Sequence, residues 1–272
     1  MRWQVRSLEL TNGVTLQYVE QGDAQGVPVL LLHGITDSWR SFEPVLPHLP
    51  AWMRAVALTQ RGHGDSDRPH SGYGPSDFAG DVVLALDALG MADAVVVGHS
   101  MGSVNAMQLA VEHPACTRGL VLVGTFASCG GHPALVEFCN TAIAPLADPI
   151  APEFVREFQE STLGQPVPEA LLAAVVAESL KVPARVWREA FSGLLEDTWT
   201  AHLSQITAPT LVVWGARDAF CPRADQEALL TTLPDARLEV YEHAGHAVHW
   251  EEPERFARDL VTFVQDVVLA RD

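Results

Sequence analysis

The stretch Val95–Ser103 reads "VVVGHSMGS" and sets a serine between two regular segments. Its valines belong to an apolar run typical of a buried strand, and the residues from Met101 onward follow a helical pattern that stops at Pro114. The letters "GHSMG" match the pattern G-x-S-x-G. In that pattern a sharp strand-to-helix turn lifts the serine hydroxyl clear of the sheet. We therefore expect Ser100 to be a nucleophile.

A serine hydroxyl is a weak nucleophile until a neighbouring base takes its proton. The chain offers an acid after the run "TLVVWGARDAF", where Asp218 lies, and a base after "RLEVYEHAGHAVHW", where His246 lies. The order serine, acid, histidine is the one expected when the acid follows the penultimate strand and the base the last. Asp37 and Asp67 also lie near strand ends and could replace Asp218, but the position of Asp218 favours it.

The remaining apolar runs predict the sheet around this turn. "VPVLLLHG", "MRAVALTQRGHG", "TRGLVLVG" and "APTLVVWG" are continuous apolar segments typical of buried parallel strands. Helical patterns separate most of them, so we expect an α/β fold with a mostly parallel sheet covered by helices on both faces. Near the N-terminus, Asn12-Gly13 lies between two alternating runs and predicts an antiparallel hairpin.

One region interrupts this alternation of strands and helices. Between Thr125 and Ala208 no convincing strand is found, whereas "APEFVREFQESTLG", "VPEALLAAVVAESLKV" and "PARVWREAFSGLLED" look helical and have prolines near their ends. The sequence therefore predicts a core made of residues 1–124 and 209–272, with a helical insertion at 125–208.

Composition excludes several classes of partner. Lys and Arg number 17 against 34 Asp and Glu, which leaves a formal net charge of −17 among 272 residues. Such an acidic surface repels phosphate backbones, so we expect no nucleic-acid partner. The N-terminal residues lack the apolar core of a secretory signal, and no run of 18 apolar residues predicts a membrane span. Four cysteines without a C-x-x-C pair are typical of free thiols, which favours a cytoplasmic location.

Three histidines near the C-terminus, in "YEHAGHAVHWEEP", are spaced three residues apart. Three imidazoles can bind one metal ion only if they converge, and Gly245 interrupts any regular helix through His243, His246 and His249. No acidic or sulfur ligand lies at a known metal-site spacing from them. We expect no metal and no cofactor, and we expect His246 alone to act on the substrate.

Several of these motifs together resemble the α/β-hydrolase superfamily over essentially the whole chain. The resemblance rests on "LLHGITDS", "QRGHGDSD", "GHSMGS", "VVWGARD" and "HAGHAVHWEEP", which occur in the order typical of the family. It implies that Ser100 is the nucleophile, His246 the general base and then acid, and Asp218 the group that orients the imidazole. It also implies that the helical insertion is a cap over the pocket.

The resemblance extends to the groups that surround the nucleophile. An oxyanion hole needs main-chain N–H groups where the negative oxygen forms, and the matching positions are Met101, directly after the nucleophile, and Ile35, in the loop after "LLLHG". Because a cap covers the nucleophile, some aromatic side chains in and near the loops should reach the substrate. The candidates for this pocket are Trp39, Phe42, Phe126, Trp187 and Trp199.

The predicted activity is hydrolysis of a small or medium carboxylic ester through an acyl-enzyme, with a small molecule as partner. Relatives that open epoxides or displace halide use Asp at this turn, so Ser100 argues against both reactions. A lactonase or a C–C bond hydrolase with the same triad remains an alternative, and so does a small-molecule receptor that turns over slowly. The sequence does not specify the natural substrate or the oligomeric state.

Overall fold

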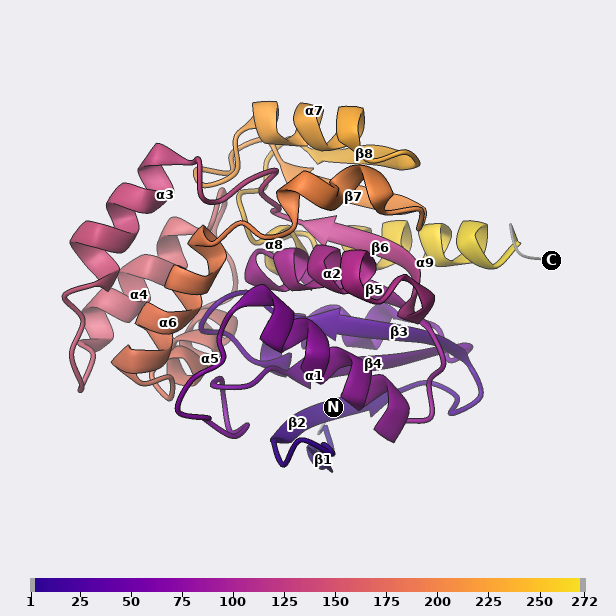
Figure 1. The fold of residues 1–272 in the computed structure, drawn as a ribbon, viewed down its shortest axis with the longest axis horizontal. Coiled ribbons are helices and arrows are strands. Elements are labelled where there is room, and N and C mark those ends of the chain that lie inside the picture. Colours follow the sequence, from indigo (N-terminus) through magenta and orange to yellow (C-terminus); the bar gives the residue numbers. More distant parts are fainter. Residues whose placement is uncertain (1–2, 270–272) are drawn as a thin grey trace.

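A computed structural model describes residues 3–269 and contains an eight-stranded sheet (Figure 1). The strand order is β1-β2-β4-β3-β5-β6-β7-β8; β1 with β2 and β2 with β4 pair antiparallel, and all other pairs are parallel. The strands are β1 (Arg6–Glu9), β2 (Thr15–Gln21), β3 (Val27–Leu32), β4 (Met53–Thr59), β5 (Ala94–His99), β6 (Thr117–Val123), β7 (Thr210–Gly215) and β8 (Ala236–Tyr241). The predicted mostly parallel sheet and its N-terminal hairpin are confirmed.

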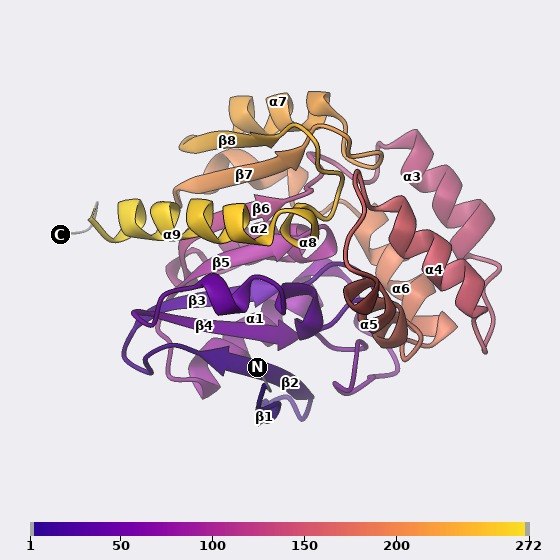
Figure 2. The same cartoon turned by 180° about the vertical axis from the view of Figure 1, so that it is seen from behind.

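Helices cover both faces of this sheet, as the continuous apolar runs require. The helices of one face are α1 (Pro75–Ala88), α2 (Met101–Glu112) and α7 (Arg223–Thr232); those of the other are α8 (Val248–Glu251) and α9 (Pro253–Leu269) (Figures 1 and 2). Alternate residues of one strand enter the two layers: Val96 of β5 packs on the α1 and α2 side, and Val95 and Val97 pack on the α9 side. Every residue of β5 is therefore buried.

Helix α9 shows why the sequence folds onto the sheet in this way. Its buried residues lie three or four positions apart, so they form one apolar stripe along the helix. They are Phe256, Ala257, Leu260, Phe263, Val264 and Val267. The stripe packs against the sheet in one continuous core with the strand residues.

Between β6 and β7 the chain forms helices only. Residues 124–209, which we call the helical segment, contain no strand and lie at one end of the sheet (Figures 1 and 2). Their elements are α3 (Pro133–Phe138), η4 (Cys139–Ile143), α4 (Pro152–Ser161), α5 (Glu169–Ser179), α6 (Ala184–Leu195) and η5 (Thr200–Gln205). Short 3₁₀ turns elsewhere are η1 (Trp39–Phe42), η2 (Leu46–His48) and η3 (Pro114–Cys116).

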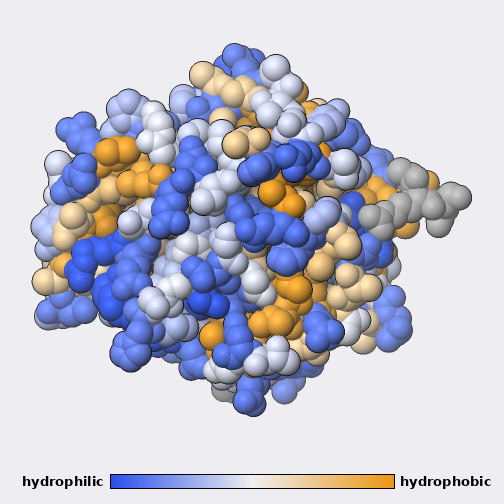
Figure 3. All heavy atoms as spheres, in the orientation of Figure 1, coloured by the Kyte–Doolittle hydropathy of each residue, from blue (hydrophilic) through white to orange (hydrophobic). Residues whose placement is uncertain are grey.

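The face seen in Figure 3 is mostly hydrophilic, with apolar residues interspersed over both the sheet helices and the helical segment. No helix among residues 3–269 is long and apolar enough to cross a membrane.

Candidate active site

Ser100 occupies the sharp turn between β5 and α2. Its backbone has φ +52° and ψ −118°, a conformation that a residue with a side chain rarely adopts. The turn persists because its main chain is bonded on both sides: the amide of Ser100 donates to Val123 O at 2.9 Å, and its carbonyl accepts from Ser103 N at 2.8 Å. The strain is therefore held by the neighbouring strand and by the first turn of α2.

The two glycines of the G-x-S-x-G motif are required by close backbone packing. A Cβ atom on Gly98 would lie 2.2 Å from the carbonyl oxygen of Gly102, and one on Gly102 would lie 2.2 Å from the carbonyl oxygen of Leu32. No side chain fits at either position, since the nearest atoms belong to backbone. The glycines thus allow the turn to press against its own helix and against β3.

His246 is held by a buried carboxylate. Its Nδ1 lies 2.9 Å from Asp218 Oδ2, and the Asp218 side chain is fully buried. The other carboxylate oxygen, Oδ1, accepts hydrogen bonds from the amides of Phe220 (2.8 Å) and Cys221 (2.9 Å). The loop after β7 therefore fixes the carboxylate, which in turn fixes the imidazole ring, while Ser100 and His246 line one cavity.

The two alternative acids lie elsewhere. Asp67 accepts a hydrogen bond from the amide of Thr15 at 2.7 Å, next to strand β2. Asp37 lines the cavity, but its carboxyl is bonded to Gln159 at 3.0 Å. Of the three candidate acids, Asp218 is the one whose carboxylate is bonded to His246.

Of the two predicted oxyanion residues, Ile35 lines the same cavity as Ser100, and Met101 directly follows Ser100 in the chain. Ile35 lies in a loop where the next residue, Thr36, has φ +70°. Met101 is the first residue of α2, and a main-chain N–H at that position has no acceptor within its own helix. The positive end of the α2 dipole adds to the attraction for negative charge at this point.

The cavity lies between the loops that follow the strands and the helical segment, and its empty space, including the part open to solvent, is about 490 Å³. Half of its lining residues are apolar, and the other half are polar or glycine. The polar residues and glycine are Gly34, Asp37, His99, Ser100, Gln159, Thr162 and His246; the apolar residues are Ile35, Phe126, Leu135, Phe158, Phe191, Leu194 and Phe220. Among the described residues no Lys or Arg lines this cavity.

Of the five aromatic residues expected in the pocket, the structure places Phe126 in the cavity wall and the other four in the core. Trp39 and Phe42 face the core on the α9 side of the sheet, and Phe42 packs on the ring of His249. Trp187 packs among phenylalanines inside the helical segment, and Trp199 is fully buried. The expectation for these four is corrected on physical grounds, because their large apolar surfaces are buried against other elements rather than against the cavity.

Residues that the sequence analysis did not single out for the pocket complete its wall. The helical segment contributes Leu135, Phe158, Gln159, Thr162, Phe191 and Leu194. The helical pattern of the sequence could have indicated Gln159, because this residue lies four positions after Val155 and both side chains lie on the same buried face of α4. Phe220 follows Asp218 by two residues and packs against the ring of His246. The position of Phe220 so close to Asp218 in the sequence could have indicated that it lines the pocket.

The three evenly spaced histidines do not converge. His243 is exposed after β8, whereas His249 is buried, contacts Ser41 Oγ at 2.9 Å and has a pKa lowered to about 3 by burial and by the nearby His246. A different group, Asp218, Cys221 and His246, brings three ligand atoms within 4.8 Å. Burial raises the pKa of the Cys221 thiol well above its ordinary value, so this sulfur stays protonated, which is the form that binds metals poorly.

Comparisons with known proteins agree with this architecture. The family model of the alpha/beta hydrolase fold matches residues 27–253, so the chain belongs to that family. A RutD protein of Variovorax paradoxus, provisionally named a carbamate hydrolase, is 34% identical over 260 residues, which cover 93% of this chain and 97% of the relative. The 2-(acetamidomethylene)succinate hydrolase of Mesorhizobium japonicum is 28% identical, with 92% of each chain covered.

The fold is also shared with solved structures. The esterase RhEst1 from a Rhodococcus species superposes with a TM-score of 0.85 at 28% identity, covering 97% of this chain and 99% of that one. The chain therefore has hydrolases as relatives and esterases as structural neighbours, although the names differ in the bond that is cleaved.

Proposed function

We propose that this protein is a serine hydrolase that cleaves a small or medium, uncharged carboxylic ester through an acyl-enzyme. The observation that carries the proposal is the 2.9 Å contact between His246 Nδ1 and Asp218 Oδ2, made beside the cavity that Ser100 also lines. Because the carboxylate binds Nδ1–H, the neutral imidazole leaves Nε2 without a proton and able to accept one.

In the first half of the reaction Ser100 Oγ attacks the ester carbonyl while His246 Nε2 takes the hydroxyl proton. The carbonyl oxygen becomes negative, and the amides of Ile35 and Met101 stabilise it. Collapse of this intermediate breaks the bond to the alcohol oxygen, which leaves with the proton from His246. The products of this half are the free alcohol and an acyl group on Ser100.

In the second half a water molecule gives a proton to His246 and attacks the acyl carbon. The tetrahedral intermediate then collapses: the bond between the acyl carbon and Ser100 Oγ breaks, Oγ takes the proton back from His246, and the carboxylic acid is released. Asp218 holds the ring in place and stabilises its charged form throughout. In this proposal the helical segment is a cap, since its side chains cover the cavity in which both halves take place.

The lining of the cavity supports a neutral substrate. Seven apolar side chains and the absence of Lys and Arg among the described lining residues suit an apolar acyl or alcohol group. A carboxylate group buried there would have no cation to pair with, which is costly. The dicarboxylate named for the Mesorhizobium relative therefore does not suit this pocket.

All four cysteines are free, in line with a cytoplasmic location.

The decisive experiment measures hydrolysis of 4-nitrophenyl esters from acetate to octanoate by the wild type and by Ser100→Ala. We expect loss of at least about 10³-fold in kcat for the alanine variant. Ser192→Ala, an exposed serine of α6, is the matched control and should keep full activity. Ser100→Ala with activity near wild type would refute the proposal.

The same assay separates the alternatives. Lactones and a C–C diketone are included beside the esters, and the bond cleaved fastest defines the class of hydrolase. A single slow turnover that leaves the acyl group on Ser100, detected by intact mass, would indicate a small-molecule receptor instead of an enzyme.

A further inference from the structure

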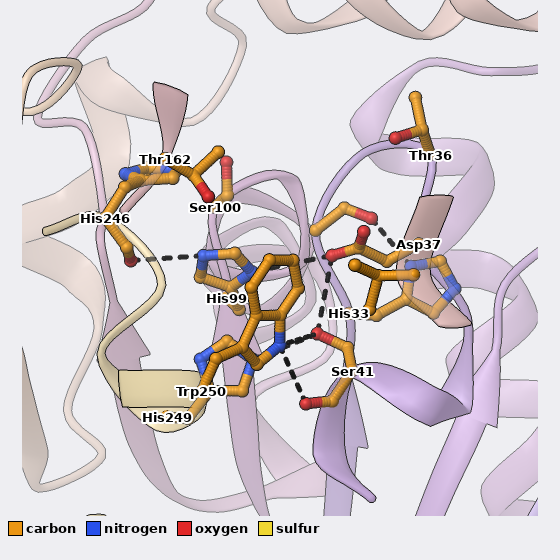
Figure 4. A network of polar contacts seen from close by, with 12 residues as sticks. His33, Thr36, Asp37, Ser41, His99, Ser100, Thr162, His246, His249 and Trp250 are labelled. Atoms are coloured by element: carbon orange, nitrogen blue, oxygen red, sulfur yellow. Dashed lines mark hydrogen bonds and ion pairs between the residues drawn. The ribbon is translucent and has the colours of Figure 1, made fainter. Parts of the chain in front are cut away.

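A narrow polar space opens beside Ser100 that the proposed reaction does not use. Its walls are Gly34, Asp37 and His99, all of which line the cavity, and we call it the polar notch. Asp37 Oδ2 and His99 Nδ1 face each other across it at 4.0 Å (Figure 4). A Cβ atom on residue 34 would lie 2.7 Å from His99 Nδ1 and 3.3 Å from Asp37 Oδ2. A side chain at residue 34 would therefore crowd both polar groups of the notch.

His99 presents a hydrogen-bond acceptor to this space. Its Nε2 lies 3.2 Å from the main-chain carbonyl oxygen of His246, and a carbonyl only accepts, so Nε2 carries the proton (Figure 4). Burial lowers the pKa of His99 well below its ordinary value, so the ring is neutral and Nδ1 is bare. Among the described residues Nδ1 has no hydrogen-bond partner, although the side chain is 97% buried. Such an atom lacks the compensation that buried polar groups require.

Asp37 presents the complementary donor. Gln159 Nε2 donates to its Oδ1 at 3.0 Å, and Oδ2, the oxygen that faces the notch, lies 3.4 Å from Ser41 Oγ. Burial, with a smaller contribution from Glu178, raises the pKa of Asp37 to about 8. This shift favours the protonated carboxyl, and because Oδ1 accepts from Gln159 we expect the proton on Oδ2, the oxygen that faces the notch.

A group that fits the polar notch must accept from Asp37 and donate to His99 Nδ1 at the same time. A hydroxyl does both with one oxygen. A methyl group would leave both partners unsatisfied, and a carboxylate could not donate to Nδ1. We propose that the polar notch binds a hydroxyl group of the substrate, so that the preferred substrates are neutral esters bearing a hydroxyl near the scissile carbonyl. This inference rests on the proposed ester hydrolysis and specifies the substrate class.

The test compares hydroxylated esters with isosteres that carry a methyl group in place of the hydroxyl. The pairs are 4-nitrophenyl esters of 2- and 3-hydroxybutyrate against 2- and 3-methylbutyrate, and 2-hydroxyethyl butyrate against propyl butyrate. The measured quantity is the ratio of kcat/KM within each pair. We expect at least one pair to favour the hydroxyl by about 10-fold, because the isostere leaves buried polar groups unpaired.

Three variants assign that preference to the polar notch. Asp37→Leu removes the donor and should bring the ratio to about 1. Asp37→Asn keeps a donor in the same place and should retain the ratio within about 3-fold. Gly34→Ala fills the notch and should abolish the preference as well. Asp87→Asn, an exposed position on α1, is the control and should leave both the ratio and the activity unchanged. Both esters of a pair are measured on the same variant, so a general loss of activity lowers both values of kcat/KM and leaves their ratio unchanged.

The outcomes separate this inference from the proposed function. If the wild type hydrolyses the plain esters but favours no hydroxylated member of the panel, the polar notch is not a substrate site and only this inference fails. A preference that survives both Asp37→Leu and Gly34→Ala would overturn it too. If Ser100→Ala retains hydrolysis of the plain esters, the proposed function itself fails. Melting temperatures identify a variant that does not fold. If Asp37→Leu or Gly34→Ala fails in this way, the other of these two variants and the wild-type ratios test the inference.

Discussion

The main-chain amide of His246 donates a hydrogen bond to the carbonyl oxygen of Thr162 at 2.8 Å. Thr162 follows helix α4 in the helical segment, whereas His246 follows the last strand of the sheet. The amide of Ala247 reaches the same oxygen at 3.3 Å. The proposed catalytic histidine is therefore held by the loop that carries it and also by the segment that covers the cavity. This end of the helical segment is attached to the site rather than free to swing open.

Glu251 strengthens the same attachment. Its carboxylate accepts hydrogen bonds from the amides of Gly245 (2.8 Å), Gln165 (2.8 Å) and Gly164 (3.1 Å), which belong to both sides of the junction. We predict that Glu251→Ala lowers the free energy of unfolding by about 2 kcal/mol, because three partly buried amides lose a charged acceptor. We also expect kcat for ester hydrolysis to fall about 10-fold with little change in KM, since the imidazole loses its alignment.

Urea unfolding and steady-state kinetics measure these two effects of Glu251. Glu251→Gln retains one acceptor oxygen and should give intermediate values. Glu254→Ala, an exposed glutamate in the first turn of α9, is the control. A Glu251→Ala variant that loses stability but keeps the wild-type kcat would show that the junction does not position His246.

The close backbone packing of the Ser100 turn predicts that Gly→Ala substitutions in this turn and in helix α1 have opposite effects on stability. Gly98→Ala and Gly102→Ala each place a methyl group 2.2 Å from a carbonyl oxygen, so we predict a loss of more than about 3 kcal/mol in unfolding free energy and no measurable esterase activity. Gly80→Ala, in the middle of α1, meets no atom within 4 Å and should stabilise the protein by up to about 1 kcal/mol.

Thermal unfolding of the three glycine variants, followed by circular dichroism, provides the comparison. The prediction is contradicted if either motif variant melts within a few degrees of the wild type and still turns over ester.

The sheet and the Ser100 turn were predictable because short-range chemistry specifies both. An apolar run of six residues followed by glycine has few alternatives to a buried strand, and a serine between two glycines at a strand end has few alternatives to this turn. The pocket wall was not predictable in the same way. Trp187 and Phe191 lie one turn apart on α6, yet only Phe191 lines the cavity. The two side chains share one face of α6, so which of them reaches the cavity depends on how α4 packs against that face through Phe158.

The polar notch shows a second limit of the sequence. Asp37 was visible as an acid on a loop at a strand end, but its partner Gln159 lies 122 residues away. Only the packing of α4 against this loop brings the amide to the carboxyl. The sequence offered the two groups but not their contact, because tertiary packing alone sets such long-range pairs.

Phe191 offers a test of how the helical segment sets substrate size. It lines the cavity and packs against Phe138, Phe158 and Trp187. We predict that Phe191→Ala raises kcat/KM for the octanoate ester relative to the butyrate ester by about 10-fold, because the removed ring leaves room for more methylene groups. The variant should also lose about 3 kcal/mol of stability. Phe154→Ala, which removes a ring packed on Trp187 outside the cavity wall, is the control and should leave the chain-length preference unchanged. An unaltered octanoate-to-butyrate ratio in Phe191→Ala would place the acyl chain elsewhere.

The buried carboxyl of Asp37 predicts how stability depends on pH. Burial raises its pKa from 3.8 to about 8, so between these values the folded state holds a proton that the unfolded chain releases. This contribution is therefore complete at low pH and is lost as the pH rises toward 8, at up to about 1.4 kcal/mol per pH unit. The pKa of His249 is lowered to about 3, and that of His63 to about 4, so these histidines act with the opposite sign and add stability as the pH rises to about 6.5.

Above pH 6.5 the unfolded histidines lose their remaining protons, so their opposing term fades while the term from Asp37 continues. We predict that between pH 6.5 and 8 the free energy of unfolding of the wild type falls by about 1–2 kcal/mol relative to that of Asp37→Asn, which cannot ionise at this position. Urea unfolding of both proteins at pH 6.5, 7.25 and 8 gives the slope of the free energy of unfolding against pH for each. Subtracting one slope from the other cancels the contributions of the acidic surface that both proteins share. Parallel slopes would mean that Asp37 is already ionised in the folded protein at neutral pH, and that its proton does not face His99 across the polar notch.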